Sequence, residues 1–64
     1  MSNKKILRLA QVKEKTGLGR STIYAEMSKG NFPKSISLGI RSIGWIEESI
    51  DDWIDERVRG WERK

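Results

Sequence analysis

Side chains that can bind an anion or a base edge gather in the first half of the chain. They are Arg20, Ser21, Thr22 and Tyr24, which surround the apolar Ile23. A guanidinium can pair with the acceptor edge of a guanine, and hydroxyl groups beside the free N–H groups of a helix start can bind phosphate. This combination predicts a surface that contacts a nucleic acid.

Each of these side chains also has a purely structural interpretation. Arg20 could be a solvated arginine at a helix start, and Ser21 and Thr22 could cap that helix, where Ser and Thr are favoured. Capping is compatible with phosphate binding, because a helix N-terminus presents free N–H groups to anions. Tyr24 could belong to the core, or its hydroxyl could reach a phosphate.

A helix and a glycine turn are expected immediately before this run. Leu9, Val12 and Thr16 recur at three- and four-residue spacing, which is typical of one face of a helix over residues 9–16. Gly17 can adopt the positive φ that ends such a helix. The turn therefore separates the first helix from the run that begins the second.

The second helix is expected over residues 21–29, with Ile23 and Met27 on one face. Gly30 and Asn31 end it, as a C-terminal stop signal does. Two short helices joined by a glycine turn, with donors at the start of the second, are typical of a helix-turn-helix that reads DNA.

A β-hairpin is expected after the second helix. Pro33 directs the chain into an extended path. Residues 35–38 alternate polar and apolar, and residues 43–45 alternate again beyond a short turn, as half-buried strands do. In a winged helix-turn-helix such a hairpin is called the wing. The predicted fold class is thus α+β, mainly α, with a winged helix-turn-helix architecture.

Three basic residues accompany the hairpin. Arg41 at its tip is either a solubilising loop residue or a contact to a DNA groove or backbone, and the exposure expected of a wing tip favours the contact. Lys29 and Lys34 flank the start of the hairpin and are predicted to make unspecific phosphate contacts.

The helical period returns from Glu47 and is expected to end near Gly60, leaving a polar tail over residues 61–64. The apolar face of this helix comprises Ile50, Trp53, Ile54 and Val58. An acidic cluster on it, Asp51, Asp52, Asp55 and Glu56, could look like a metal site. Because the helical period distributes these carboxylates around a polar face and histidine is absent, a solvated face is favoured, and no metal is expected.

The same periodicities define a predicted core, which Trp45 and Trp53 are expected to complete by tying the wing and the last helix to the first two helices. Its members are Leu9, Val12, Leu18, Ile23, Met27, Phe32, Ile36, Leu38, Ile43, Trp45, Ile50, Trp53 and Ile54. A core of this size supports only a marginally stable domain.

Composition indicates one domain over residues 1–64, ordered over about residues 6–59, with a basic N-terminal tail. Residues 1–45 carry nine Lys and Arg against two Glu, a charge of +7, and residues 46–64 carry four against seven acidic residues, a charge of −3. The net charge is +4, and the excess of positive charge lies on the part that contains the glycine turn. A basic lobe of this kind attracts a polyanion, although a soluble lysine-rich surface would have the same composition.

Absent residue types exclude several chemistries. The chain has no Cys and no His, which excludes disulfides, thiol nucleophiles, thiolate zinc sites and the commonest general base. Residues 1–20 show no signal peptide, and no run approaches the roughly 20 apolar residues that span a bilayer. We expect a cytoplasmic protein that is not an enzyme, binds no cofactor and does not associate with membranes.

Several motifs together resemble one known family. They are Leu9, Val12, Thr16-Gly17-Leu18, Arg20-Ser21-Thr22-Ile23-Tyr24, Gly30, Phe32-Pro33-Lys34, Leu38-Gly39, Arg41, Gly44-Trp45 and Ile50-Trp53-Ile54. Over about residues 6–58 the chain resembles the AlpA family of small phage and prophage regulators, which are related to MerR-type winged helix-turn-helix proteins and to phage excisionases. The long coiled coil and effector domain of full MerR regulators are missing, which puts a built-in dimer and a small-molecule sensor in doubt.

The resemblance implies two helices, a two-stranded hairpin wing and a C-terminal helix. It places Arg20, Ser21, Thr22 and Tyr24 on the recognition helix and Arg41 and Ser42 on the wing. Such proteins regulate transcription of integrase genes, act as excisionases in site-specific recombination, or do both.

We therefore expect a sequence-specific, double-stranded-DNA-binding protein, associated with the nucleoid when bound. The second helix would enter the major groove and the wing would lie along the backbone or minor groove. Because one small module covers few base pairs, specificity would come from self-association on adjacent sites or from a partner such as integrase or RNA polymerase. The alternative is a small adaptor whose basic lobe binds an acidic protein partner.

Overall fold

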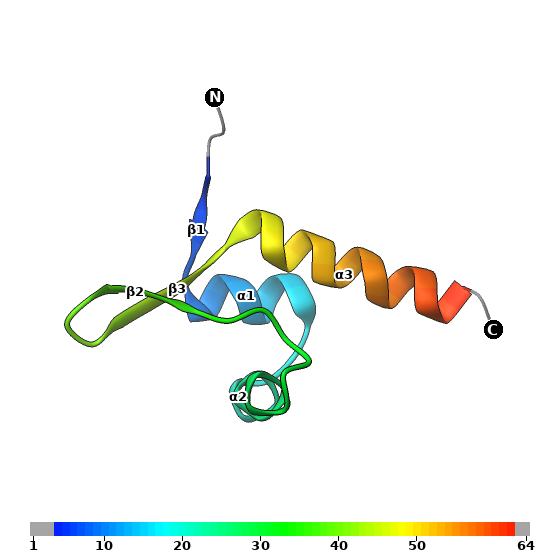
Figure 1. Ribbon diagram of the computed structural model, residues 1–64, viewed down its shortest axis with the longest axis horizontal. Coiled ribbons are helices and arrows are strands. Elements are labelled where there is room, and N and C mark those ends of the chain that lie inside the picture. The colour runs from blue at the N-terminus through cyan, green and yellow to red at the C-terminus, as the bar shows by residue number, and fades with distance from the viewer. Residues whose placement is uncertain (1–3, 63–64) are drawn as a thin grey trace.

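The computed structural model describes residues 4–62 and has an α+β fold that is mainly helical (Figure 1). Its elements in order are β1 (Ile6–Leu7), α1 (Leu9–Thr16), α2 (Arg20–Lys29), β2 (Ile36–Gly39), β3 (Ser42–Ile46) and α3 (Glu47–Glu62). The predicted winged helix-turn-helix architecture is confirmed: α1 and α2 form the helix pair, and β2 and β3 form the hairpin. In Figure 1 the hairpin and α3 extend to opposite sides of the helix pair.

The sheet has three antiparallel strands in the order β1-β3-β2 rather than the two that the sequence predicts. Leu7 is paired with Trp45, and Ile36 is paired with Gly44. The N–H of Glu47 donates to the carbonyl of Lys5 over 2.8 Å, which joins the start of α3 to the chain before β1. The sequence thus predicted the hairpin strands but not β1. β1 covers an edge of β3 that a two-stranded wing would leave open.

Gly44 in the central strand has no room for a side chain. A Cβ there would lie 2.6 Å from Cγ2 of Ile6 and 3.0 Å from the carbonyl oxygen of Leu7. Atoms that close repel strongly, so β1 can approach β3 only where the chain has glycine.

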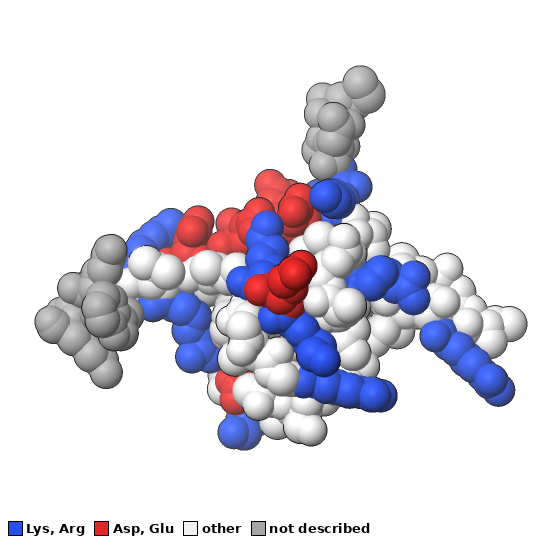
Figure 2. All heavy atoms as spheres, turned by 180° about the vertical axis from the view of Figure 1, so that it is seen from behind, with Lys and Arg blue, Asp and Glu red and all other residues white. Residues whose placement is uncertain are grey.

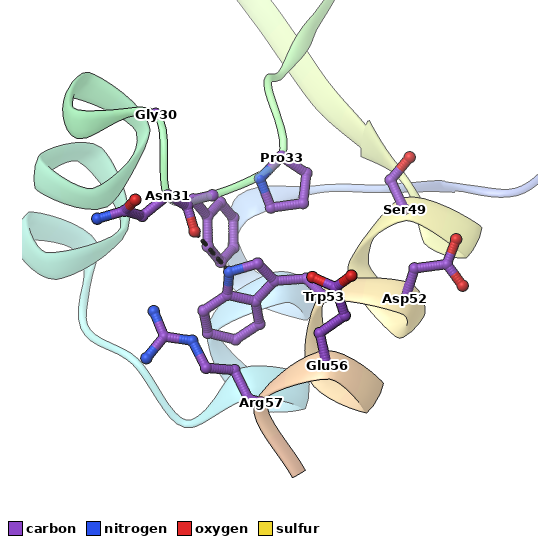
Figure 3. A pocket seen from close by; sticks show the side chains of 9 residues that line it. Gly30, Asn31, Pro33, Ser49, Asp52, Trp53, Glu56 and Arg57 are labelled. Atoms are coloured by element: carbon purple, nitrogen blue, oxygen red, sulfur yellow. Dashed lines mark hydrogen bonds between the residues drawn. The ribbon is translucent and has the colours of Figure 1, made fainter. Parts of the chain in front are cut away.

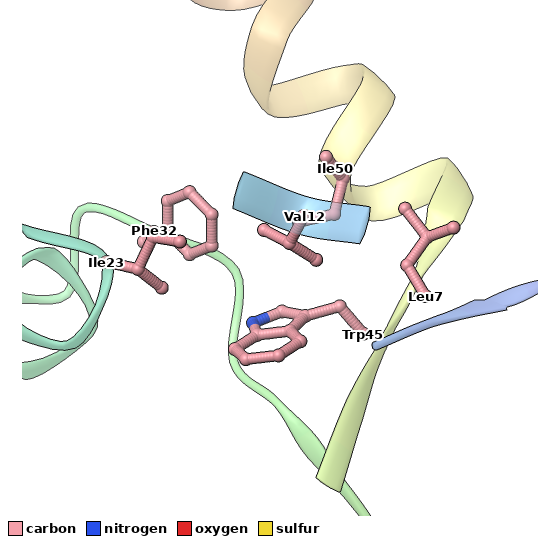
Figure 4. Close-up of a cluster of buried hydrophobic side chains, with 6 residues drawn as sticks. All are labelled: Leu7, Val12, Ile23, Phe32, Trp45 and Ile50. Carbon is pink, nitrogen blue, oxygen red and sulfur yellow. The ribbon is translucent and has the colours of Figure 1, made fainter. Parts of the chain in front are cut away.

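Six side chains, each from a different part of the fold, make up the buried core (Figure 4): Leu7, Val12, Ile23, Phe32, Trp45 and Ile50. Around them pack the partly buried Leu9, Leu18, Met27, Ile43, Trp53 and Ile54. Most of the predicted core is confirmed, and Leu7 is an addition. Every element except β2 contributes a buried residue, so the core holds the helices and the β1–β3 pair together.

The prediction that Ile36 and Leu38 belong to the core is wrong. Their side chains are 37% and 43% exposed, and β2 is an edge strand whose four residues are all exposed. Alternation identifies a strand with one apolar face, but it does not say whether another layer covers that face. Here α1 and α3 pack against β3 and leave β2 uncovered.

α3 continues past Gly60 to Glu62, so the predicted end of this helix is also wrong. A single glycine in a helix costs only about 1 kcal/mol, which fifteen other residues of the same helix can offset. The remainder of the predicted polar tail, residues 63–64, and the first three residues of the basic tail lie outside the described residues. No helix within residues 4–62 is both long enough and apolar enough to cross a membrane.

An ion-pair cluster links α1 to α3. The ammonium of Lys15 lies 2.9 Å from the carboxylate of Asp51 and 3.3 Å from that of Glu47. Hydrogen bonds to Asp51 and then to Glu47 raise the pKa of Lys15 above its ordinary value. The charge of Lys15 is therefore balanced within the protein.

Candidate nucleic-acid interface

The turn between α1 and α2 is closed by local hydrogen bonds. Gly17 has a φ of 75°, and its N–H donates to the carbonyl of Lys13 over 2.8 Å. The hydroxyl of Thr16 donates to the carbonyl of Val12 over 2.7 Å and accepts the N–H of Leu18 over 3.2 Å. Leu18 then packs against the core. These contacts fix the direction in which α2 leaves the turn, as predicted for Gly17.

α2 begins one residue earlier than predicted, at Arg20, with Gly19 as its N-cap and no side-chain capping bond. The structural interpretation of Ser21 and Thr22 as caps is therefore wrong. Because the first N–H groups of a helix have no intrahelical acceptor, they stay available at this end of α2. The hydroxyl groups of Ser21 and Thr22 are exposed beside them.

The outer face of α2 is a strip of small exposed residues. Ser21, Ala25 and Ser28 recur at four- and three-residue spacing and are exposed, whereas Ile23 on the opposite side is completely buried. Ala25 and Ser28 were missed because neither carries a charge, although their spacing from Ser21 could have identified them. A strip of small side chains lets the helix backbone approach a partner closely.

Two larger side chains flank this strip. The guanidinium of Arg20 lies over the ring of Tyr24, 5.8 Å from its centroid, and Tyr24 is 38% exposed. The alternative that Tyr24 is a core aromatic is therefore wrong. A cation–π contact at an exposed site is weak, so it orients Arg20 without holding it away from a ligand.

The hairpin carries the other predicted contacts. Arg41 occupies the two-residue turn between β2 and β3 with a φ of 64°, the one positive φ of a non-glycine residue within residues 4–62. Ser42 begins β3 and is half-buried, whereas Lys34 is exposed in the loop before β2. The eight predicted residues thus fall into three places: the first half of α2, the segment from Lys29 to Lys34, and the hairpin tip.

Two tryptophans hold the segment between α2 and β2. The indole N–H of Trp45 donates to the carbonyl of Pro33 over 3.1 Å. The indole N–H of Trp53 donates to the carbonyl of Asn31 over 2.6 Å, as the dashed line in Figure 3 shows. The ring of Phe32 packs edge-on against Trp53, with 4.8 Å between centroids. The predicted structural role of both tryptophans is confirmed, and their contacts set the position of the hairpin relative to α2.

Ion pairing divides the cations into two groups. Among the side chains that the structure describes, residues 4–60, those of Lys4, Lys15, Lys29 and Arg57 lie within 4 Å of a carboxylate, but those of Arg20, Lys34 and Arg41 do not. Lys29 is an intermediate case, because its ammonium lies 3.8 Å from Glu26 and its side chain is 65% exposed. Arg20, Lys34 and Arg41 thus stay available for an external anion, a property that they share with Lys5, Arg8, Lys13 and Arg59.

Charge also separates the faces of the molecule (Figure 2). Lys and Arg side chains project from the lower side and at a few places along the otherwise uncharged hairpin, whereas a group of Asp and Glu side chains lies along α3. A groove between α3 and the segment that follows α2 carries the carboxylates of Asp52 and Glu56, and the guanidinium of Arg57 lies 4.6 Å from the centroid of the Trp53 ring (Figure 3). The carboxylates would repel phosphate, so we do not expect this groove to contact DNA.

Comparison with known proteins identifies the family. Residues 5–58 match the family described as prophage CP4-57 regulatory protein (AlpA). The chain belongs to the AlpA family. One relative, the DNA-binding transcriptional activator AlpA of Escherichia coli K12, is 43% identical over 61 residues, covering 86% of this chain and 87% of that protein. A second relative, the uncharacterized protein ORF88 of Enterobacteria phage P4, is 35% identical over 63 residues, covering 98% of this chain and 72% of that protein.

Proposed function

We propose that this AlpA-family chain is a sequence-specific, double-stranded-DNA-binding regulator of transcription. The observation that carries the proposal is the outer face of α2, where small exposed residues and the unpaired Arg20 follow a tightly closed glycine turn. The name of the Escherichia coli relative supports it. A DNA-reading helix needs this combination of a buried inner face and an exposed outer face with donors at its start.

In the proposed complex α2 lies in the major groove. Ser21, Ala25 and Ser28 face the base edges, and their small size allows close approach. Arg20 is placed to donate to the O6 and N7 acceptors of a guanine, and the free N–H groups at the start of α2 are placed to bind a phosphate. Lys29, Lys34 and Arg41 neutralise phosphates on either side of the groove.

A single domain of this size reads few base pairs. We propose that several copies bind adjacent sites, or that RNA polymerase or an integrase provides the additional contacts. A role as an excisionase would use the same α2 contacts, and we place it second. An effect on excision in the presence of an integrase, without any effect on a neighbouring promoter, would reverse that order.

The test is a titration of the protein against a duplex that it selects from a random-sequence pool, with a scrambled duplex as control. If about four to six phosphates are neutralised, the slope of log affinity against log salt is roughly −4 to −5. Ala25→Glu places a carboxylate on the exposed face of α2 and should abolish binding to both duplexes while leaving the fold intact. Binding that is flat in salt, or that favours acidic proteins over DNA, would support the adaptor alternative instead.

A further inference from the structure

The tip of the hairpin violates the usual preferences of a tight turn. Its two residues are Ile40 and Arg41, whereas two-residue hairpin turns favour glycine, asparagine and aspartate. The isoleucine side chain is 92% exposed, and the arginine after it adopts a φ of 64°, which costs energy for any residue with a Cβ. Residues that break local rules in this way are expected where they serve a function.

The surroundings of Ile40 indicate what it contacts. The hairpin extends away from the helices (Figure 1), and no carboxylate among the described side chains of residues 4–60 lies within ion-pair distance of the adjacent Arg41. An apolar side chain at a cationic, protruding tip suits a partner that is negatively charged outside and apolar inside. Double-stranded DNA is such a partner, because its phosphates surround stacked bases.

We propose that Ile40 is a wedge that enters the minor groove and partly unstacks one base step, which kinks the duplex. The inference rests on the proposed function and adds a second activity to it. The minor groove is about 6 Å wide, which admits a two-residue turn more readily than a helix. Its negative potential attracts Arg41, and apolar wedges of this kind bend DNA by roughly 20–90°.

Bending is measured by energy transfer between dyes at the two ends of the selected duplex, and unstacking by a fluorescent base analogue placed at successive steps. The wild-type protein should shorten the end-to-end distance and increase the emission at one step. Ile40→Asn introduces a residue that tight turns favour, so the hairpin should still form, and it should remove most of the bend. Its affinity should fall by less than about 10-fold, because lost side-chain burial is offset by the unstacking that is no longer required.

Two control variants separate the wedge from other causes. Val58→Ala removes carbon atoms from a side chain that is 48% exposed on α3, and it should leave bend and affinity unchanged. Arg41→Ala should reduce the salt slope by about one, whereas Ile40→Asn carries no charge change and should leave the slope as it is.

The possible failures are distinguishable. A wild-type protein that binds no duplex selectively would overturn the proposed function itself. Selective, salt-dependent binding to a duplex that stays straight, or a bend that Ile40→Asn does not reduce, would overturn the wedge alone. Loss of cooperativity in Ile40→Asn with an unchanged bend for each bound copy would also overturn it, in favour of a contact between copies.

Discussion

α2 and the hairpin form two parts of one proposed interface, but the protein supports them differently. α2 buries Ile23 completely, and the segment after it is held by hydrogen bonds from Trp45 and Trp53. In the hairpin, every residue of β2 is exposed and Ile40 at the tip is 92% exposed. β3 itself is anchored by the buried Trp45, so the difference lies in β2 and the tip. A supported helix presents side chains in a fixed geometry that can distinguish bases, whereas an exposed outer strand and tip add affinity and adapt to the shape of the duplex.

The largest effect is expected from a matched pair of truncations in the two parts. Ile23→Ala removes a fully buried side chain of α2 and should lower the free energy of unfolding by about 2–5 kcal/mol. Leu38→Ala removes a side chain that is 43% exposed on β2, and it should change the free energy of unfolding by only about 0.5 kcal/mol. Urea unfolding followed by circular dichroism measures both. Equal losses would show that the hairpin is as firmly integrated as α2.

A second pair separates base recognition from backbone contact. Arg20→Ala should reduce discrimination between the selected and the scrambled duplex by roughly 1–3 kcal/mol, because a bidentate contact to guanine is lost. Arg41→Ala should weaken binding to both duplexes by similar factors. Fluorescence anisotropy titrations measure the ratio of the affinities for the selected and the scrambled duplex. If Arg20→Ala leaves affinity for the selected duplex unchanged, α2 is not the reading element.

A smaller effect is expected from relieving the strained turn. Arg41→Gly should raise the free energy of unfolding by about 1 kcal/mol, because glycine adopts a positive φ without steric cost, while DNA binding weakens. Arg41→Lys keeps both the charge and the Cβ, and should leave stability and salt slope close to those of the wild type. A less stable Arg41→Gly variant would contradict the assignment of strain to the hairpin tip.

The smallest effect concerns a cation outside both parts. The contacts with Asp51 and Glu47 raise the pKa of Lys15, so its stabilisation is fully present below the unfolded value of about 10.4 and is lost as the pH rises through the higher folded value. The stability difference between wild type and Lys15→Gln should therefore shrink only in strongly alkaline solution. Unfolding midpoints of both proteins at neutral and alkaline pH measure this difference in stability.

The same variant tests the boundary of the interface. Because two carboxylates already balance Lys15, Lys15→Gln should leave the salt slope of DNA binding unchanged. A slope reduced by about one would mean that α1 contacts phosphate as well. The interface would then include a third region besides α2 and the hairpin.

Local features of the sequence were sufficient to predict both helices of the helix-turn-helix, the turn at Gly17, the hairpin and the start of α3. Helical period, alternation and the positive φ of glycine are properties of neighbouring residues, so they can be recognised without knowing what packs where. The same features predicted the basic and hydroxyl side chains of the candidate site. Contact of those side chains with DNA stays a prediction.

Tertiary structure alone decided the features that depend on segments far apart in the chain. β1 has only two residues, and it is a strand because Trp45 and Ile46 of β3 pair with it, with Gly44 leaving room for its approach. Ile36 and Leu38 alternate as core residues do, but no layer covers β2. Lys15 resembles the other cations in sequence, and it is neutralised because α3 lies beside α1. Burial and charge pairing are set by which surfaces meet, and a residue's sequence neighbours do not determine that.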